Sequence, residues 1–409
     1  MVARLRHALL FRFRHPTRRP EMAVTRRHLV LAGAGHAQMD LLPALVRERL
    51  DGWEISLITP QPDFHYSGML PAIIAGNASP TAATIPVATI ARAGGMQVHL
   101  ASVIALDIAA RTLSLSNGAT VRYDLLSLDV GSTAAGLDVP GARQHAFAMR
   151  PFSAALGLIA RLDAVCRQRA RGEVVPIVVV GAGAGGVEIA LALRARVQRA
   201  GFTPQLTIVD AAATDGLPLP GFSASSRQRA HEALSRRGIA VVGGTVTSVA
   251  PDAVMVEVQQ RESRLPSAAT AWVSGPAAHG WLASSGLSCD TAGYPLASAT
   301  LALSSVQGRA SIFGAGDCVV LRDAGATPKA GVYAVRMAPV LAANVLAIAR
   351  GEQPRATYTP QRDFLALLST GDGSAILRWR GVTVESRWAQ WLKTWIDARY
   401  LRRYRDLSP

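Results

Sequence analysis

Two glycine turns, each set between a short apolar strand and a helix, constrain the fold of this chain most. The first reads GAGHAQ at 33–38, after an apolar strand at 28–32 and before a helix that ends near residue 50. The second reads GAGAGG at 181–186, after a strand at 177–180, and begins 148 residues later. Further apolar strands follow at 54–58 and 205–210. Two such βαβ openings predict an α/β protein with two Rossmann-like dinucleotide-binding domains.

The second unit has the full G-x-G-x-x-G pattern, with Gly181, Gly183 and Gly186 as candidate cofactor ligands. Glycines permit the tight turn and let backbone N–H groups approach a diphosphate at the positive end of the helix. Asp210 ends the next strand, where an acid accepts hydrogen bonds from a ribose and repels a 2′-phosphate. This favours NADH over NADPH, although Arg227 keeps NADPH open.

The first unit departs from this pattern at two places. Gln38 replaces the third glycine, and Thr59 with the proline after it stands where an acid is expected. A phosphate site and a simple glycine bend in a buried strand explain the turn equally well. The candidate ligands here are Gly33, Gly35, His36 and Ala37.

A third glycine turn occurs late in the chain, in the sequence FGAGD at 313–317. Gly316 and Asp317 follow an apolar strand, which places a carboxylate at the strand's C-terminal edge, where ligands gather. A helix is predicted to start near Lys329 and Ala330, after Pro328. The chain has 41 arginines and only two lysines, so Lys329 suggests a chemical role, with a solvated helix-end lysine as the equal alternative.

Together these features resemble the two-dinucleotide-binding-domain flavoproteins of the pyridine nucleotide-disulfide oxidoreductase superfamily. Within it, the chain is similar to the type II NADH dehydrogenase and sulfide:quinone reductase branch, and to a bacterial family sometimes fused ahead of selenide, water dikinase. The likeness runs from about residue 26 to 405. The stretches that carry it are GAGHAQ at 33–38, YSGMLPAIIAG at 66–76, YDLLSLDVGS at 123–132, FGAGD at 313–317, TPKAGVYAVRMAPVLAANV at 327–345 and PQRDFLALLSTGDGSAI at 360–376.

The resemblance implies an FAD domain split across 26–150 and 290–375, with an NAD(P)H domain at 151–289 inserted in it. A basic leader at 1–25 and an amphipathic basic tail at 376–409 flank these domains.

The resemblance also assigns roles to residues. The turn at Gly33 is expected to hold the FAD diphosphate, and the loop Tyr66–Pro71 to border the isoalloxazine ring. Gly131 lies where the family has an A-T-G stretch that passes the FAD. Asp317 is expected to bond the ribityl chain, and the helix start at Lys329 to face the N1/O2 edge of the flavin.

One further residue carries a catalytic expectation. Glu188 matches a glutamate that lies near the meeting point of nicotinamide and flavin in type II dehydrogenases. Ordinary capping of the first helical turn is the alternative, and we favour it slightly.

The positions of the cysteines limit the redox reactions that the chain is expected to catalyse. Cys166, Cys289 and Cys318 are far apart in sequence, so there is no C-x-x-C pair and no metal-ligand spacing. None matches the pair that a disulfide reductase needs beside its flavin. The superfamily name therefore does not describe the expected activity.

The formal net charge of +15 is concentrated at the two ends. Residues 1–27 carry +7 and residues 376–409 carry +5, which leaves about +3 for the body and argues against a nucleic-acid binder. The arginine-rich start lacks a signal-peptide core, and we favour a loose leader upstream of Met22 over a transit peptide. The apolar stretch 174–193 contains Pro176, several glycines and an acid, so it predicts strand, turn and helix, and no transmembrane helix is predicted.

The tail contains three tryptophans on one helical face. Trp388, Trp391 and Trp395 recur at helical spacing and precede Arg399, Arg402, Arg403 and Arg405. Tryptophan favours the membrane boundary and arginine attracts anionic lipid, so a monotopic anchor is one reading. A helix packed on the body or on a dimer partner is the other.

The leading functional hypothesis is an FAD-dependent NAD(P)H dehydrogenase that passes electrons to a second acceptor, with a quinone as the favoured one. It places the protein in a bacterial cytoplasm, with the cytoplasmic face of the inner membrane as a possible site, and leaves a homodimer open. One alternative keeps the flavin but acts on a sulfur or selenium species. Another is a membrane-docking module whose flavin does not turn over.

Overall fold

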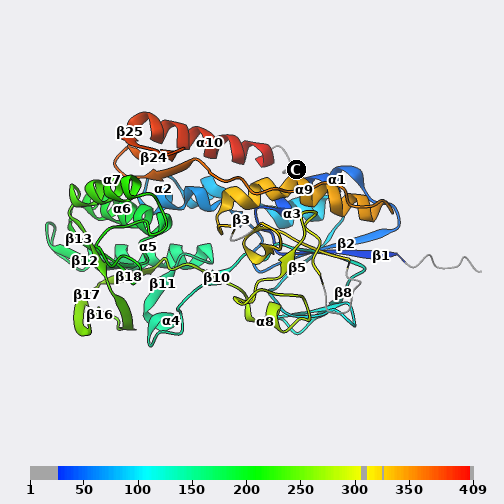
Figure 1. Cartoon of the computed structure of the whole chain (residues 1–409), viewed down its shortest axis with the longest axis horizontal. Coiled ribbons are helices and arrows are strands. Elements are labelled where there is room, and N and C mark those ends of the chain that lie inside the picture. The colour runs from blue at the N-terminus through cyan, green and yellow to red at the C-terminus, as the bar shows by residue number, and fades with distance from the viewer. Residues whose placement is uncertain (1–25, 305–310, 325–326, 406–409) are drawn as a thin grey trace, which may run out of the picture.

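The computed structural model describes residues 26–304, 311–324 and 327–405, so the expected leader at 1–25 lies outside it. Two α/β domains lie side by side, and the C-terminal segment forms a layer along one side of both (Figure 1). The fold class is the one the two glycine turns predict.

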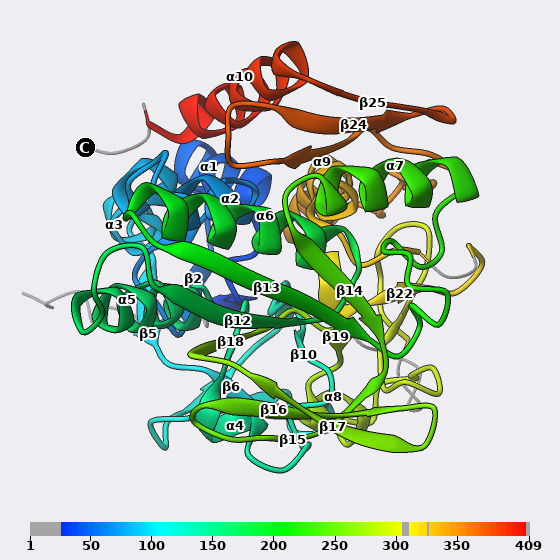
Figure 2. The same ribbon diagram turned by 90° about the vertical axis from the view of Figure 1, so that its left-hand side faces the viewer.

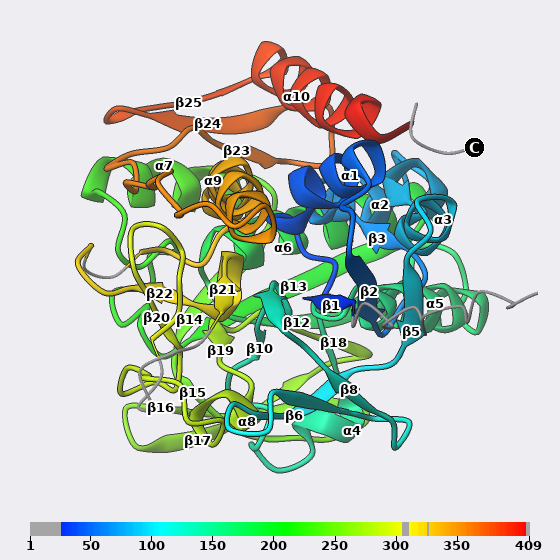
Figure 3. The ribbon, with the colours of Figure 1, turned by 90° about the vertical axis from the view of Figure 1, so that its right-hand side faces the viewer.

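The first domain is built on a parallel five-stranded sheet in the order β21-β9-β1-β2-β5. Its strands are β1 (Arg27–Ala32), β2 (Trp53–Thr59), β5 (Gln97–Leu100), β9 (Leu125–Leu128) and β21 (Ile312–Gly314). Helices α1 (Gln38–Glu48) and α9 (Gly331–Ala349) lie together on one side of it (Figure 3). An antiparallel meander, β6 (Val103–Asp107), β7 (Thr112–Leu115) and β8 (Thr120–Arg122), connects β5 to β9.

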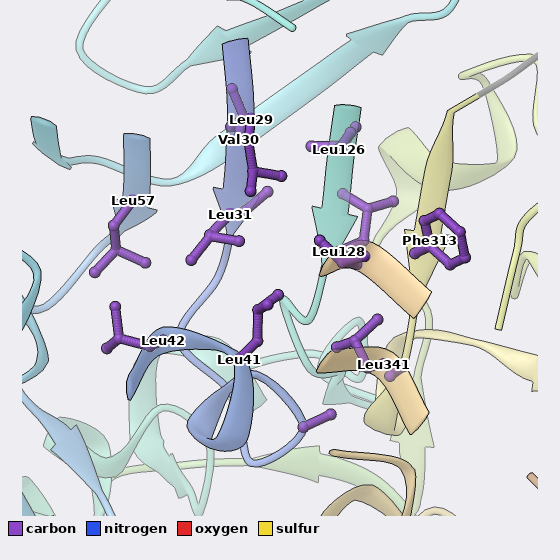
Figure 4. Packing of buried hydrophobic residues seen from close by; sticks show 14 of the residues in the cluster. Leu29, Val30, Leu31, Leu41, Leu42, Leu57, Leu126, Leu128, Phe313 and Leu341 are labelled. Atoms are coloured by element: carbon purple, nitrogen blue, oxygen red, sulfur yellow. The ribbon is translucent and has the colours of Figure 1, made fainter. Parts of the chain in front are cut away.

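Apolar side chains fill the space between this sheet and its helices. Leu31 of β1 and Leu128 of β9 point toward Leu41 of α1 and Leu341 of α9, and all four are fully buried (Figure 4). Because the strands are covered on both faces, they read as continuous apolar runs rather than alternating ones.

The second domain repeats this plan in the order β11-β18-β12-β13-β14, again all parallel (Figure 2). Its strands are β11 (Ala146–Ala148), β12 (Val174–Val180), β13 (Thr203–Asp210), β14 (Ile239–Gly243) and β18 (Ala269–Trp272). Its helices are α5 (Phe152–Arg167), α6 (Ala184–Arg199) and α7 (Ala224–Ser235), and its meander is β15 (Thr245–Val249), β16 (Ala253–Val258) and β17 (Arg261–Pro266). The internal repeat therefore extends beyond the βαβ openings to the meander and the fourth strand.

The chain crosses from the first domain to the second, and back again, slightly before the expected boundaries at 151 and 289. Strand β11 already belongs to the second sheet. On the return, β19 (Pro276–Ala277) pairs with β10 (Thr133–Ala134), and Leu282 in α8 (Gly280–Ala283) is buried in the core of the first domain.

The remaining short elements complete the two domains. They are β3 (Phe64–His65), η1 (Ser67–Met69), α2 (Leu70–Ile74), η2 (Pro80–Ala83), β4 (Thr84–Ile85), α3 (Val87–Ala93), α4 (Ala142–His145), β20 (Leu296–Ala297), η3 (Gly316–Cys318) and β22 (Val320–Leu321).

The apolar stretch 174–193 folds as the sequence predicts, into strand β12, a turn and helix α6. Among the described residues, α9 is the one helix long and apolar enough to cross a membrane. More than half of its most apolar window is buried, and Met337, Leu341 and Val345 belong to the core of the first domain. Its hydropathy is explained by that core position.

The C-terminal segment is more than a helix. A three-stranded antiparallel sheet, β23 (Ala366–Ser369), β24 (Ala375–Trp379) and β25 (Val382–Ser386), precedes α10 (Arg387–Arg405). The sequence predicts the helix but not this sheet. Strand β25 contacts α7 of the second domain, and Tyr400, Leu401 and Tyr404 of α10 are buried in the core of the first.

Candidate functional site

The second glycine turn has the geometry of a dinucleotide-binding loop. A Cβ on Gly181 would lie 2.4 Å from the Val273 carbonyl oxygen, and one on Gly186 would lie 1.8 Å from that of Gly181, so neither position accepts a side chain. Gly183 has nothing within 4 Å of its Cβ position and leads directly into α6. The first and third glycines therefore allow close packing, while the second leaves open space at the helix N-terminus.

Asp210 lies at this turn, as the sequence predicts from its place at the end of β13. Its carboxylate accepts hydrogen bonds from the backbone N–H groups of Ala182, at 2.6 Å, and Ala212, at 2.8 Å. Arg227 is the residue that left NADPH as an alternative to NADH. It pairs with Asp215 at 2.6 Å and also donates to backbone carbonyl groups. Its guanidinium is thus held by an acid other than Asp210.

The first glycine turn borders a cavity of about 280 Å³. This cavity brings together Gly33 and Gly35 of the turn with Gly131, which lies about a hundred residues later. Its other walls come from the end of β2 with Thr59, the loop after β2, the start of the meander, and His279 with Trp281 on the returning chain. Residues assigned separately to FAD from the sequence therefore line one space.

Asp129 is a part of this site that the sequence reading missed. A Cβ on Gly33 would lie 2.2 Å from its carbonyl oxygen, and a Cβ on Gly35 would lie 2.4 Å from its side-chain oxygen Oδ1. Its other side-chain oxygen, Oδ2, accepts the N–H groups of Ala37 and Gln38 at 2.7 and 2.9 Å. Burial raises the pKa of Asp129 to about 7. The backbone of Ala37, a candidate phosphate ligand, is therefore already bonded to a carboxyl group.

The structure explains why the third glycine of this unit is replaced. The Gln38 side chain is buried and donates its amide N–H to the Ser127 carbonyl oxygen at 2.8 Å. This bond links the start of α1 to β9. Position 38 therefore carries a side chain that forms a hydrogen bond, where the G-x-G-x-x-G pattern has a glycine that allows close backbone packing.

His36 connects the first glycine turn to the start of α9. Its ring packs edge-on against Phe64, with the centroids 4.9 Å apart, and lies 3.6 Å from the Cβ position of Gly331. Burial lowers the pKa of His36 to about 4, so the imidazole is neutral at physiological pH.

Asp317 lies in η3, directly after β21, and forms an ion pair with Arg150 at 2.9 Å. The sequence reading missed Arg150, which also donates to Ser132 and lies where the chain passes between the domains. A Cβ on Gly316 would lie 2.6 Å from Asp129, which places Gly316 and Asp317 beside the first turn.

Lys329 lies two residues before α9 begins at Gly331. Its ammonium group donates to the Val319 carbonyl oxygen and lies 4.1 Å from the centre of the Tyr294 ring. Burial lowers its pKa, although Cys318 and Asp317 partly offset this. These contacts give Lys329 a structural role in holding the segment before α9. Its expected role beside a flavin stays a prediction.

Glu188 is not an exposed capping residue. It lies in the second turn of α6 with a side chain 13% exposed, and it accepts the Ser369 N–H of β23 at 2.8 Å. Lys393 of α10 approaches it to 3.5 Å and donates to the Gly68 carbonyl oxygen at 3.1 Å. A buried acid and a buried lysine thus join α6, α10 and η1, which contains Gly68.

Two more α10 residues extend this cluster. Asp397 lies 3.9 Å from Lys393 and accepts the Tyr66 hydroxyl at 3.1 Å. The Tyr66 ring stacks on Tyr400, with a centroid distance of 4.4 Å. Burial raises the pKa of both Glu188 and Asp397, while the two acids hold the pKa of Lys393 above its ordinary value in spite of burial. The segment 66–71, expected as a loop that borders a flavin, is instead folded as η1 and the start of α2, and the C-terminal helix holds it in place.

No described cysteine is prepared for thiol chemistry. Cys166, Cys289 and Cys318 are all free. Burial raises the pKa of Cys318 to about 12, and its thiol donates to the Ala315 carbonyl oxygen. The thiol nearest the expected flavin site therefore stays protonated.

The C-terminal layer exposes large apolar side chains on α10 and at the turn between β24 and β25. The exposed fractions are 49% for Trp379, 61% for Val382, 55% for Trp388, 68% for Trp391 and 48% for Trp395. We call these five residues the tryptophan face. The other side of α10 packs on the body, as one of the two interpretations of the tail expects. Membrane binding by the exposed side stays a prediction.

Comparisons with known proteins agree with this architecture. A family model described as pyridine nucleotide-disulphide oxidoreductase matches residues 27–343. An NADH dehydrogenase-like protein of Mycobacterium tuberculosis is 27% identical over 201 residues, which cover 48% of this chain and 49% of that protein. The demethylphylloquinone reductase of Synechocystis is 26% identical over 267 residues, 64% of this chain and 63% of that one. The chain thus spans about half of the first relative and under two thirds of the second.

Solved structures share the fold over nearly the whole chain. The sulfide:quinone oxidoreductase of Aquifex aeolicus has a TM-score of 0.74 and 18% identity, covering 93% of this chain and 92% of that one. NDH2 of Plasmodium falciparum, solved in complex with NADH, has a TM-score of 0.70 and 12% identity, covering 94% and 99%. At such identities the likeness shows the fold.

Proposed function

Because the chain belongs to the pyridine nucleotide-disulphide oxidoreductase family, we propose that it oxidises NAD(P)H through a bound FAD and reduces a second acceptor. One observation carries this proposal: two glycine turns of dinucleotide-binding geometry lie in two sheets of the same topology. The described cysteines offer no thiolate at this site, which favours direct transfer to an acceptor over disulfide chemistry.

We place the adenosine and diphosphate part of FAD in the cavity at the first turn. The positions of Gly33 and Gly35 leave no room for side chains, and Gly131 completes the wall. We place the ribityl chain toward Asp317 and the start of α9, because Gly316 lies beside Asp129 of this cavity and Gly331 lies beside His36. Bound FAD supplies two-electron chemistry, accepting a hydride from the nicotinamide.

We place NAD(P)H at the turn that begins at Gly181, with Gly183 as the point of closest approach. NADH is the favoured donor, because Asp210 presents an acid there and Arg227 is engaged with Asp215. Glu188 of the adjoining helix and Lys329 before α9 are the residues we assign to the reacting region.

A quinone is the favoured acceptor. The demethylphylloquinone reductase and the sulfide:quinone oxidoreductase among the similar proteins are named for such a substrate. The tryptophan face supports the same choice, because it would hold the protein at a membrane surface, where quinones reside. Arg399 and Arg402 on α10 add positive charge for anionic lipid.

A steady-state acceptor screen tests this proposal. FAD-loaded protein is given NADH or NADPH with a short-chain quinone, polysulfide or selenite as acceptor. Quinone turnover with preference for NADH supports the assignment. Turnover with polysulfide or selenite and none with quinone would instead favour the sulfur or selenium alternative.

A further inference from the structure

Asp129 occupies an unusual position for an acid. Among the residues that the structure describes, it is the least exposed aspartate or glutamate, at 3%. It lines the cavity at the first glycine turn, where we place the anionic diphosphate of FAD. An ionised carboxylate at that place would repel the ligand.

The two oxygens of its carboxyl group have different surroundings. Oδ2 accepts both N–H groups at the start of α1, from Ala37 and Gln38. Oδ1 faces the places where Gly35 and Gly316 have no side chain, since Cβ atoms there would lie 2.4 and 2.6 Å away. Within the described residues nothing donates a hydrogen bond to Oδ1, so this oxygen is free for a ligand.

The charged and titratable groups around Asp129 do not neutralise it. Asp317 and Cys318 act on Asp129 directly, and His36, Arg150 and Lys329 in turn lie near Asp317 or Cys318. His36 and Cys318 are neutral at physiological pH, because burial lowers the pKa of the imidazole and raises that of the thiol. Arg150 is paired with Asp317, and Lys329 donates to a backbone carbonyl group. Among the described residues, therefore, Asp129 forms no ion pair.

We propose that Asp129 binds the FAD diphosphate as a neutral carboxylic acid. Oδ2 holds the start of α1, and the proton on Oδ1 is donated in a hydrogen bond to a phosphate oxygen. Flavin binding then takes up one proton from solvent and flavin release returns it, with no bond in FAD formed or broken. This inference rests on the proposed function, because it requires FAD in the cavity.

Calorimetric titration with FAD tests the proton directly. The full chain, freed of flavin, is titrated at pH 8 in two buffers of different ionisation enthalpy. We expect uptake of about one proton per FAD bound, and a Kd that rises about tenfold from pH 8 to pH 9. The Asp129→Asn variant should bind FAD with no proton uptake and a Kd nearly independent of pH, since the amide both accepts and donates.

Asp63→Asn is the matched control, because Asp63 lines the same cavity from the loop after β2. It should leave the proton count of the wild type unchanged. FAD binding by the wild-type chain without proton uptake overturns the inference while leaving the proposed function intact, and so does an Asp129→Asn protein that still takes up the proton. If the wild-type chain fails to bind FAD at any pH, the proposed function fails, and this inference with it. The wild-type proton count decides the matter even if Asp129→Asn does not fold.

Discussion

The ammonium nitrogen of Lys393 on α10 lies 3.5 Å from the Glu188 carboxylate on α6. The two side chains are 11% and 13% exposed, so the C-terminal helix is joined to the second domain by a buried ion pair. The same lysine bonds the Gly68 carbonyl oxygen of the first domain. One residue of the tail therefore links both domains at the place where the two cofactors are expected to meet.

Replacing Lys393 by methionine should destabilise the protein by about 3 kcal/mol, because it leaves Glu188 and Asp397 buried without a cation. Urea unfolding measures this free energy. The exposed pair Arg264–Asp252 supplies the control, and Arg264→Met should unfold close to the wild-type midpoint. A Lys393→Met protein as stable as the wild type would show that the buried pair contributes nothing.

Asp129 and His36 should give opposing pH dependences of stability. The pKa of Asp129 is raised from 3.8 to about 7, so its contribution is present below about pH 4 and is lost as the pH rises to about 7. The pKa of His36 is lowered from 6.5 to about 4, so its contribution is lost as the pH falls through this interval.

The Asp129→Asn variant separates these two effects in flavin-free protein. Relative to wild type, its free energy of unfolding should increase from pH 4.5 to pH 7.5 and then level off. Urea denaturation at several pH values measures the difference. A difference that does not change with pH would mean that Asp129 titrates alike in the folded and unfolded chains.

Donor preference should depend on Asp210. In Asp210→Ser the carboxylate that favours a free ribose is lost, so kcat/KM for NADH should fall about tenfold or more relative to NADPH. Arg227→Ala should change this ratio much less, because its guanidinium is held by Asp215. An unchanged ratio in Asp210→Ser would remove the basis for preferring NADH.

The tryptophan face should govern membrane binding. Trp388→Ser combined with Trp391→Ser removes its two most exposed tryptophans and should weaken binding to anionic vesicles at least about tenfold. Vesicle flotation measures this, and Ile104→Ser, at a residue 52% exposed on the meander of the first domain, is the control. Equal flotation of all three proteins would assign the face to another partner.

The sequence predicts the local features of this molecule well. The two glycine turns, the acid at Asp210 and the helix at the C-terminus all depend on short motifs with strong backbone preferences. Their repetition also predicts two domains of one type, although the repeat in the structure extends further, through both meanders.

The contacts between distant segments were not predicted. Lys393 meets Glu188 across about 200 residues, and Arg150 meets Asp317 across a similar distance, so neither pair has a local pattern. The sequence does contain one indication of the first pair. Lysine is scarce in this chain, and the scarcity that suggests a chemical role for Lys329 suggests a role for Lys393 equally. The sequence also contains an indication of a role for Asp129. This residue lies two positions before Gly131, in the stretch that corresponds to the family's A-T-G and was expected to pass the FAD.

Anaerobic rapid mixing of FAD-loaded protein with NADH tests the central claim most directly. We predict that NADH bleaches the visible absorption band of the flavin within the time of a single turnover, and that a quinone added afterwards restores it. If FAD is bound and neither NADH nor NADPH reduces it, the chain is not an NAD(P)H oxidoreductase.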